Sequence, residues 1–113
     1  MTTGPSPGTP GLDAVLHNPT RLAVAAFLSE CAEAEFAVVR DHCQVSDSVL
    51  SKAASALEDA GYVEIRKGHV GKRSRTWLSL TPTGQGSLAR HVTALQEIVA
   101  AARNAAAGTR ADE

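Results

Sequence analysis

Four cationic side chains fall within nine residues near the middle of the chain. They are Lys67, Lys72, Arg73 and Arg75, and Gly68 and Gly71 lie among them. Ammonium and guanidinium groups pair with phosphate oxygens, and glycine lets the backbone turn tightly and approach a ligand closely. The cluster therefore predicts binding to a phosphate backbone. The alternative is a solvated hairpin tip without a ligand.

The segments on either side of the cations would position them. Residues 62–66 (YVEIR) and 76–80 (TWLSL) are both of strand type, so residues 67–75 are predicted to be the tip of a β-hairpin. Tyr62 and Trp77 are expected to pack over the base of this hairpin rather than stack on nucleic-acid bases.

A helix with a polar face is predicted just before the hairpin. Ser46 is a suitable N-cap, and apolar residues recur at helical spacing from Leu50 to Leu57. Small polar or cationic residues on the opposite face can approach base edges. The candidates for DNA contact are Ser46, Ser48, Ser51, Lys52 and Ser55. An ordinary solvent-exposed helix face is the alternative.

Charge is distributed unevenly, although the formal net charge is only −1. Residues 1–60 hold three Lys or Arg against eight Asp or Glu, residues 61–91 hold six against one, and residues 92–113 hold two against three. The three segments therefore carry −5, +5 and −1. Positive charge concentrated around the hairpin is typical of a local phosphate-binding surface.

The N-terminal half is expected to consist of short helices. A helical turn is predicted at residues 12–17, followed by a helix that begins at Asn18-Pro19 and fades over residues 32–35. A second short helix at residues 36–44 precedes the polar-faced helix. Two short helices joined by a tight turn are typical of a helix-turn-helix.

A long helix is predicted at the end of the chain, with Thr81 as its N-cap and Pro82 in its first turn. Its apolar residues follow a heptad pattern: Leu88, Val92, Leu95, Val99, Ala102 and Ala106. A small domain cannot easily cover such a seam, so part of it is expected to contact another subunit. We expect residues 1–11 to be a disordered arm, residues 12–107 one domain with its dimerisation helix at 82–107, and residues 108–113 a frayed tail.

This order of elements resembles the compact bacterial winged-helix transcriptional regulators of the MarR/ArsR type. The resemblance covers about residues 12–99. Five sequence pieces carry it: NPTRL at 18–22, LSK at 50–52, LEDAGYV at 57–63, GKRSRTW at 71–77 and LTPTG at 80–84. It implies a mainly α fold with a β-hairpin wing, and a homodimer joined through its first and last helices. It also implies recognition helices in successive major grooves and wings along the DNA backbone or minor groove.

The resemblance assigns base contact by position to Ser48, Ser51, Lys52 and Ser55 and wing contact to Lys72, Arg73 and Arg75. The residues expected at the dimer interface are Leu12, Leu16, Leu88, Val92, Leu95, Val99 and Ala102, and an effector, if one is used, is expected in a cleft near Leu16, His17, Phe27 and Leu95. The chain departs from the family after Lys52, where Ala53, Ala54, Ser55 and Ala56 replace longer donors. Fewer long donors shift the expected recognition toward the wing and DNA shape.

Other kinds of site have weak support. Cys31 and Cys43 are expected to be small buried residues rather than a redox or metal centre, and a reducing compartment suits them. His91 and Glu97 are six residues apart and so lie on different faces of a helix, which argues against metal sensing. No catalytic constellation, cofactor motif or membrane-spanning stretch is apparent, so we expect a cytoplasmic protein that is not an enzyme.

These features lead to one main hypothesis. The chain is expected to be a homodimeric, sequence-specific double-stranded DNA-binding transcriptional regulator. We expect a repressor that occludes its operator and is released by a small-molecule effector. The alternative is a winged-helix module that binds another protein through the seam of its last helix.

Overall fold

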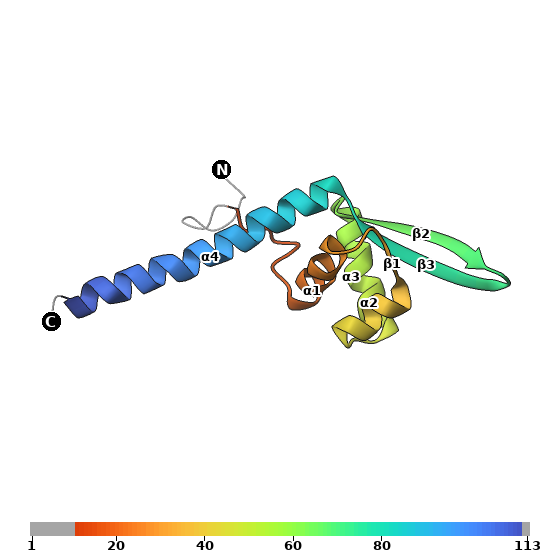
Figure 1. Cartoon of the computed structure of the whole chain (residues 1–113), viewed down its shortest axis with the longest axis horizontal. Coiled ribbons are helices and arrows are strands. Elements are labelled where there is room, and N and C mark those ends of the chain that lie inside the picture. Colours follow the sequence, from red (N-terminus) through yellow and green to blue (C-terminus); the bar gives the residue numbers. More distant parts are fainter. Residues whose placement is uncertain (1–10, 112–113) are drawn as a thin grey trace.

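The computed structural model describes residues 11–111, which form four helices and three strands (Figure 1). The elements in chain order are α1 (Pro19–Ser29), β1 (Ala34–Glu35), α2 (Phe36–Cys43), α3 (Asp47–Asp59), β2 (Val63–Val70), β3 (Arg73–Leu80) and α4 (Pro82–Ala111). The predicted fold class, mainly α with a β-hairpin wing and a long last helix, is confirmed. Of the predicted N-terminal arm, residues 1–10 lie outside the described part.

The helices begin where the sequence predicts. The side-chain oxygens of Asn18, Ser46 and Thr81 accept hydrogen bonds from backbone N–H groups three residues later, at 3.0, 3.2 and 3.0 Å. Pro19 and Pro82 are the first residues of their helices, where a missing N–H leaves no bond unmade. Local capping chemistry therefore fixes these three helix starts.

The N-terminal half was expected to be entirely helical, but it also contributes a short strand to the sheet. Residues 12–17 form a single turn, closed by the N–H of His17 donating to the carbonyl of Asp13 at 2.8 Å. Helix α1 then ends at Ser29, earlier than predicted, and Ala34–Glu35 form a strand that pairs with Leu78 and Trp77. The sheet therefore has three strands in the order β1-β3-β2. A two-residue strand depends on long-range pairing and has almost no local sequence signal.

The wing strands are longer than predicted. Strand β2 continues to Val70 and β3 begins at Arg73, so the turn between them consists of Gly71 and Lys72. Gly71 has φ +62°, a left-handed conformation that glycine adopts without a steric penalty. Lys67, Arg73 and Arg75, which were placed in a tip loop, therefore lie within paired strands. Helix α4 continues to Ala111, beyond the predicted boundary at residue 107.

One apolar core holds α1–α3, the sheet and the start of α4 together. Its buried members include Leu16, Val24, Leu28, Val39, Leu50, Leu57, Val63, Leu78 and Leu88. Figure 1 shows the wing extending from one side of this body and most of α4 extending from the other. The core thus fixes the recognition-type helix α3 relative to both projections. Among residues 11–111, no helix is long and apolar enough to cross a membrane.

The start of α4 packs closely on the end of the wing. A Cβ atom added at Gly84 would overlap the carbonyl oxygen of Tyr62 and crowd the side chain of Leu80. The N–H of Thr81 also donates to that carbonyl, at 2.9 Å. Gly84 therefore permits a helix-to-backbone approach that a residue with a side chain would prevent.

Candidate nucleic-acid interface

Helix α3 buries one face and leaves the other exposed. Leu50, Ala53, Ala54 and Leu57 are buried in the protein, as their helical spacing predicts. The five residues predicted to contact DNA from this region are all exposed: Ser46, Ser48, Ser51, Lys52 and Ser55. Their position on the surface fits the prediction, and contact with bases stays a prediction.

A hollow of about 290 Å³ lies between α3 and the sheet. The residues that line it come from α2, α3 and the wing strands: Phe36, Ser51, Ala54, Ser55, Ile65, Lys67, Thr76 and Leu78. The aliphatic and aromatic side chains supply apolar surface, and the serines, the threonine and the lysine supply polar groups. Residues of the helix and of the wing therefore border one shared depression, which the order of elements along the chain did not predict in detail.

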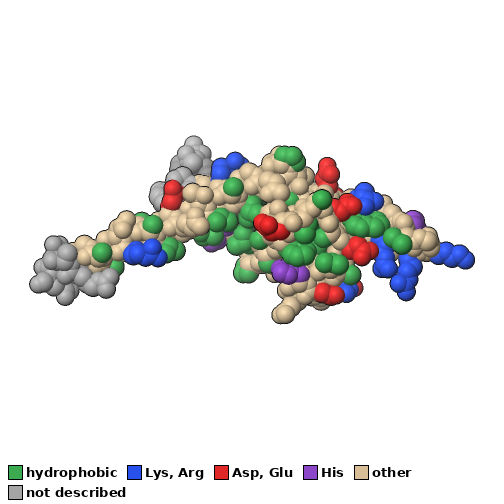
Figure 2. Space-filling view, viewed as in Figure 1, with side chains coloured by type: hydrophobic (Ala, Val, Ile, Leu, Met, Phe, Trp, Pro, Cys, Tyr) green, Lys and Arg blue, Asp and Glu red, His purple; other side chains and the backbone are tan. Residues whose placement is uncertain are grey.

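Strand alternation divides the predicted wing cations between two faces. Lys67 pairs with Thr76 and shares a face with Ile65 and Leu78, which point toward the core and α3. Arg73 and Arg75 alternate with Ser74 and Thr76, and so lie on the opposite, outer face. Lys72 lies in the turn. Figure 2 shows several Lys and Arg side chains at the wing end of the molecule, and others farther toward the opposite end.

His69 is a candidate contact that the sequence analysis missed. It is exposed and pairs with Ser74 on the same strand face as Lys67. Side chains two residues apart on a strand share a face, so His69 lies on the face of Ile65 and Lys67. This placement follows from the sequence only when the strand is known to reach Val70.

Carboxylates partly neutralise the outer face of the wing. Arg66 forms an ion pair with Glu33 at 2.7 Å, and Arg75 forms one with Glu35 at 3.3 Å. Within residues 11–111, Lys67, Lys72 and Arg73 take part in no ion pair. These three cations are therefore the more available for phosphate. The sequence analysis did not predict these acidic partners, because Glu33 and Glu35 lie beside the wing only through the pairing of β1 with β3.

The polar face of α3 also has acidic neighbours at its start. Arg40 of α2 lies 2.9 Å from carboxylate oxygens of both Asp41 and Asp47. The hydrogen bond to Asp47, and next the one to Asp41, raise the pKa of the Arg40 guanidinium. Arg40 thus offsets the charge of Asp47, which would otherwise repel phosphate at the start of α3.

The family model described as "Winged helix DNA-binding domain" matches residues 20–99. That range contains α1 apart from Pro19, all three strands, α2, α3 and the first part of α4. The chain belongs to the family of winged-helix DNA-binding domains. This membership supports a DNA-binding transcriptional regulator and gives no indication of an enzyme. Among proteins with curated descriptions, none matches the sequence.

Solved structures with the same fold include transcriptional regulators of the MarR family. A transcriptional regulator homologue from Pyrococcus horikoshii OT3 is 25% identical with a TM-score of 0.72, over 77% of this chain and 86% of that one. A MarR-family regulator from Silicibacter pomeroyi is 24% identical with a TM-score of 0.60, over 74% and 56%. The PcaV regulator from Streptomyces coelicolor is 18% identical with a TM-score of 0.65, over 76% and 60%. The chain thus spans little more than half of the latter two proteins, and these two likenesses show the fold alone. The predicted resemblance to winged-helix transcriptional regulators is confirmed, and it extends to MarR-family proteins at the level of the fold.

The predicted dimerisation residues of this winged-helix chain fall into two groups. Leu16 is fully buried and Leu88 is 8% exposed, so both pack in the core of the protomer and present little surface to a second copy. Leu12 and Leu95 are partly exposed. Val92 is 38% and Val99 55% exposed, and Ala102 is also exposed. The first apolar residue of the seam is buried because the N-terminal end of α4 packs on the core, and the later ones are exposed or partly exposed because the rest of the helix extends beyond it.

Ile98 extends the exposed apolar surface of α4. It is 40% exposed and lies three residues after Leu95. The heptad listing omitted it, although its spacing from Leu95 and Ala102 is helical. From residue 96 to 109 every residue of α4 is exposed, so this part of the helix makes little contact with its own protomer.

The four residues predicted to form an effector cleft point to different neighbours. Leu16 is fully buried in the core, so it cannot line an open cleft without a rearrangement. The Phe27 ring stacks on His42 of α2 at a centroid distance of 4.2 Å, and His17 lies edge-on to His91 at 5.6 Å. Leu95 lines a hollow of about 320 Å³ together with Gln96, Val99 and Arg103. Within the described part of this protomer, the four residues therefore do not line one common cleft.

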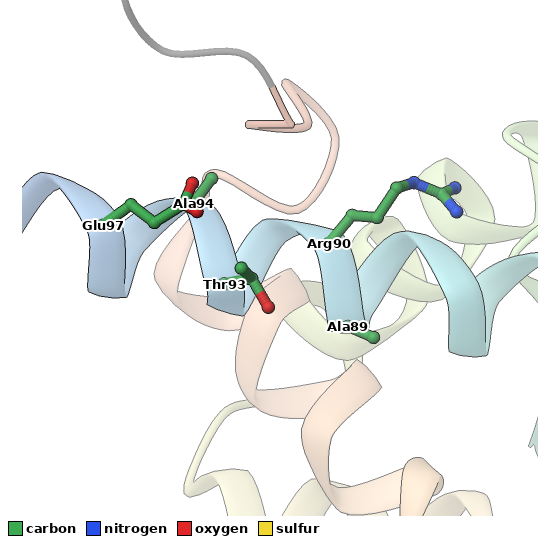
Figure 3. Close-up of a pocket in the computed structure, with 5 residues that line it drawn as sticks. All are labelled: Ala89, Arg90, Thr93, Ala94 and Glu97. Atoms are coloured by element: carbon green, nitrogen blue, oxygen red, sulfur yellow. The ribbon is translucent and has the colours of Figure 1, made fainter.

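A second hollow, of about 230 Å³, lies along α4. Figure 3 shows the small side chains of Ala89, Thr93 and Ala94 between the extended side chains of Arg90 and Glu97. The five described residues that line it all come from α4, so within residues 11–111 no second element contributes to its lining. It therefore has the form of a helix surface rather than of a ligand pocket.

Both cysteines are half-buried and unpaired. The Cys31 thiol donates to the carbonyl of Phe27 at 3.4 Å, and burial raises the pKa of the Cys43 thiol. A raised pKa lowers the thiolate fraction and hence the reactivity. In the part of the chain that the structure describes, no three His, Cys, Asp or Glu residues are placed to hold a metal ion.

Proposed function

We propose that this chain is a homodimeric, sequence-specific double-stranded DNA-binding transcriptional regulator that represses by occluding its operator. The hollow shared by α3 and the wing carries the proposal. Ser51 and Ser55 of α3 face the same depression as Lys67 and Thr76 of the wing. One duplex can therefore meet the helix in its major groove while the wing meets the adjacent backbone.

The proposed homodimer is supported by the exposed apolar surface of α4. The residues from 96 to 109 cover about 20 Å of helix at 1.5 Å per residue, and Ile98 and Val99 are exposed along it. A second copy that covers this surface would remove apolar area from water in both protomers. The two copies of α4 would then fix the spacing of two recognition helices at about one helical turn of DNA, roughly 34 Å.

Release by a small-molecule effector is the remaining part of the proposal. Two structural neighbours support it: NadR is in complex with 4-hydroxyphenylacetate, and PcaV is in complex with its natural ligand. In this chain the hollow beside Leu95, Val99 and Arg103 is open within one protomer. The partner protomer of the proposed dimer would cover it, so the effector would bind only in the assembled protein.

The proposal is tested by fluorescence-anisotropy titration against the DNA upstream of the chain's own gene and against a scrambled duplex, at several salt concentrations. If a dimer engages about eight phosphates, log affinity should fall with log salt at a slope of about −7. The triple variant Lys67→Ala/Lys72→Ala/Arg73→Ala should lose most binding. Arg90→Gln removes an exposed cation on α4, away from the wing, and should bind like the wild type.

The alternative hypothesis, that the chain is a protein-interaction module, predicts another outcome. An apolar interface through α4 responds little to salt, and its wing cations would be incidental. A titration without binding to either duplex at low salt would contradict the DNA-binding proposal and favour this module. Binding to both duplexes with equal affinity would contradict sequence specificity for the tested fragment and would leave general DNA binding supported.

A further inference from the structure

The outer face of the wing combines arginines with carboxylates. Register and alternation place Arg66 opposite Trp77, Arg75 opposite Gly68, and Arg73 opposite Val70, all on this face. Glu35 of β1 pairs with Trp77 and so shares the face. Phosphate and carboxylate are both anions that a guanidinium can bind, and they compete for it.

Arg66 is held firmly. Its Nη2 and Nε donate to the two carboxylate oxygens of Glu33 at 2.7 and 3.2 Å, and its guanidinium lies 4.2 Å from the centre of the Trp77 ring. The hydrogen bonds from Arg66 lower the pKa of the Glu33 carboxyl. A Cβ atom at Gly68 would crowd this Trp77 ring at 3.2 Å. Two bonds and a stacked ring make Arg66 a structural part of the wing base.

Arg75 is held loosely by comparison. Its Nε lies 3.3 Å from Oε1 of Glu35, but this buried Nε has no hydrogen-bond partner among residues 11–111. The two side chains are 35% and 38% exposed, less than the 56% and 40% of Arg66 and Glu33, so the missing hydrogen bond rather than exposure distinguishes this pair. A partly exposed ion pair without hydrogen bonds contributes little to stability and exchanges partners readily.

We propose that Glu35 is an intramolecular competitor of DNA phosphate for Arg75. In the free protein Glu35 cancels one wing cation, and a phosphate must displace it before Arg75 contributes to binding. Because phosphate contacts supply most of the affinity for random DNA, this competition lowers non-specific binding. On the operator, insertion of α3 into the major groove presses the DNA backbone onto the wing, so a phosphate displaces Glu35 there. The competition therefore raises the ratio of the affinity for the operator to the affinity for random DNA. This role rests on the proposed DNA-binding function.

The test compares Glu35→Gln with Glu64→Gln by anisotropy titration on a random duplex over a range of salt. Glu64 is exposed on the same outer face, opposite Ser79, and takes part in no ion pair within residues 11–111. The two variants therefore change net charge equally. Glu35→Gln should bind roughly three- to tenfold more tightly near 0.1 M salt, with a slope steeper by about 0.9 for each arginine that gains a phosphate. Glu64→Gln should keep the wild-type slope.

The Arg75→Ala background separates the proposed exchange from a general charge effect. There, adding Glu35→Gln should bring no gain in affinity. A gain that persists without Arg75, a gain equal to that of Glu64→Gln, or no gain at all would overturn the role of Glu35. Thermal unfolding of each variant establishes that it is folded. A folded wild type that binds no duplex would instead overturn the proposed function, and the role of Glu35 with it.

Discussion

The backbone N–H of Asp13 donates a hydrogen bond to Nδ1 of His91 over 3.0 Å and joins segments 78 residues apart. The Asp13 carboxylate also accepts a hydrogen bond from the Tyr62 hydroxyl. One residue of the N-terminal turn thus connects α4 to the start of β2. Because Nδ1 accepts this hydrogen bond, it carries no proton itself, so the His91 ring is neutral and its proton is on Nε2, a buried atom without a partner among the described residues.

The neutral state of His91 predicts that acid destabilises the fold. Burial lowers the pKa of His91, and the neighbouring His17 lowers it further, while Asp13 opposes them. Between this lowered pKa and the unfolded value of about 6.5, the unfolded chain binds more protons than the folded chain. The contribution of His91 to stability is therefore complete above about pH 6.5 and is lost as the pH falls toward the folded pKa.

Thermal unfolding measured from pH 7.5 to 5 checks this prediction. His91→Gln keeps a hydrogen-bond acceptor for Asp13 but does not titrate, so its melting temperature should fall less on acidification than that of the wild type. His69→Gln, on the exposed wing, should retain the wild-type pH dependence. Equal pH dependence in the wild type and His91→Gln would show that His91 does not titrate on unfolding.

Two glycines of α4 should respond in opposite ways to alanine. Gly84→Ala places a Cβ against the carbonyl of Tyr62, which is backbone and cannot move aside easily, so we expect a loss of about 1–3 kcal/mol in the free energy of unfolding. Gly108 has open space around its Cβ position. Gly108→Ala should be neutral or stabilise by up to about 1 kcal/mol, since alanine favours helix. Chemical denaturation measures both, and equal effects would contradict the close packing at Gly84.

The N-cap serine of α3 and a serine on its exposed face should differ in their effect on stability. Ser46 caps the helix through Val49 N–H, so Ser46→Ala should cost about 1 kcal/mol of stability. Ser55 is exposed and faces the hollow beside the wing. Ser55→Ala should leave the free energy of unfolding within about 0.5 kcal/mol of the wild type and weaken operator binding. Denaturation and anisotropy on the same samples check the pair, and unchanged DNA binding in Ser55→Ala would remove Ser55 from the interface.

The assembly prediction concerns the exposed seam of α4. Val99→Glu introduces a charge into an apolar surface that a second copy is proposed to cover, so it should yield monomers and weaken operator binding at least tenfold. Val99 is 55% exposed in the protomer, so the fold should survive. Ala100→Glu adds the same charge one residue later, about 100° around the helix, and should stay dimeric. Light scattering reports the mass, and a dimeric Val99→Glu would contradict an interface at this seam.

Much of the architecture was predictable because its signals are local. Capping residues and the helical spacing of Leu50 to Leu57 depend on neighbours within a few positions, and the structure places them as predicted. Strand β1 was not predictable in this way. Two residues are too few for a pattern, and Ala34 and Glu35 become a strand only because β3 lies beside them.

The candidate site shows the same division. The sequence by itself determined that cations gather on a hairpin behind a polar-faced helix, and that the last helix carries an apolar seam. Only the tertiary structure decided which cations carry acidic partners and which seam residues face inward. Arg75 meets Glu35 across strands 40 residues apart in sequence, and Leu88 is covered by a core assembled from distant elements. Charge pairing and burial depend on three-dimensional proximity, and a single sequence encodes that only through the complete fold.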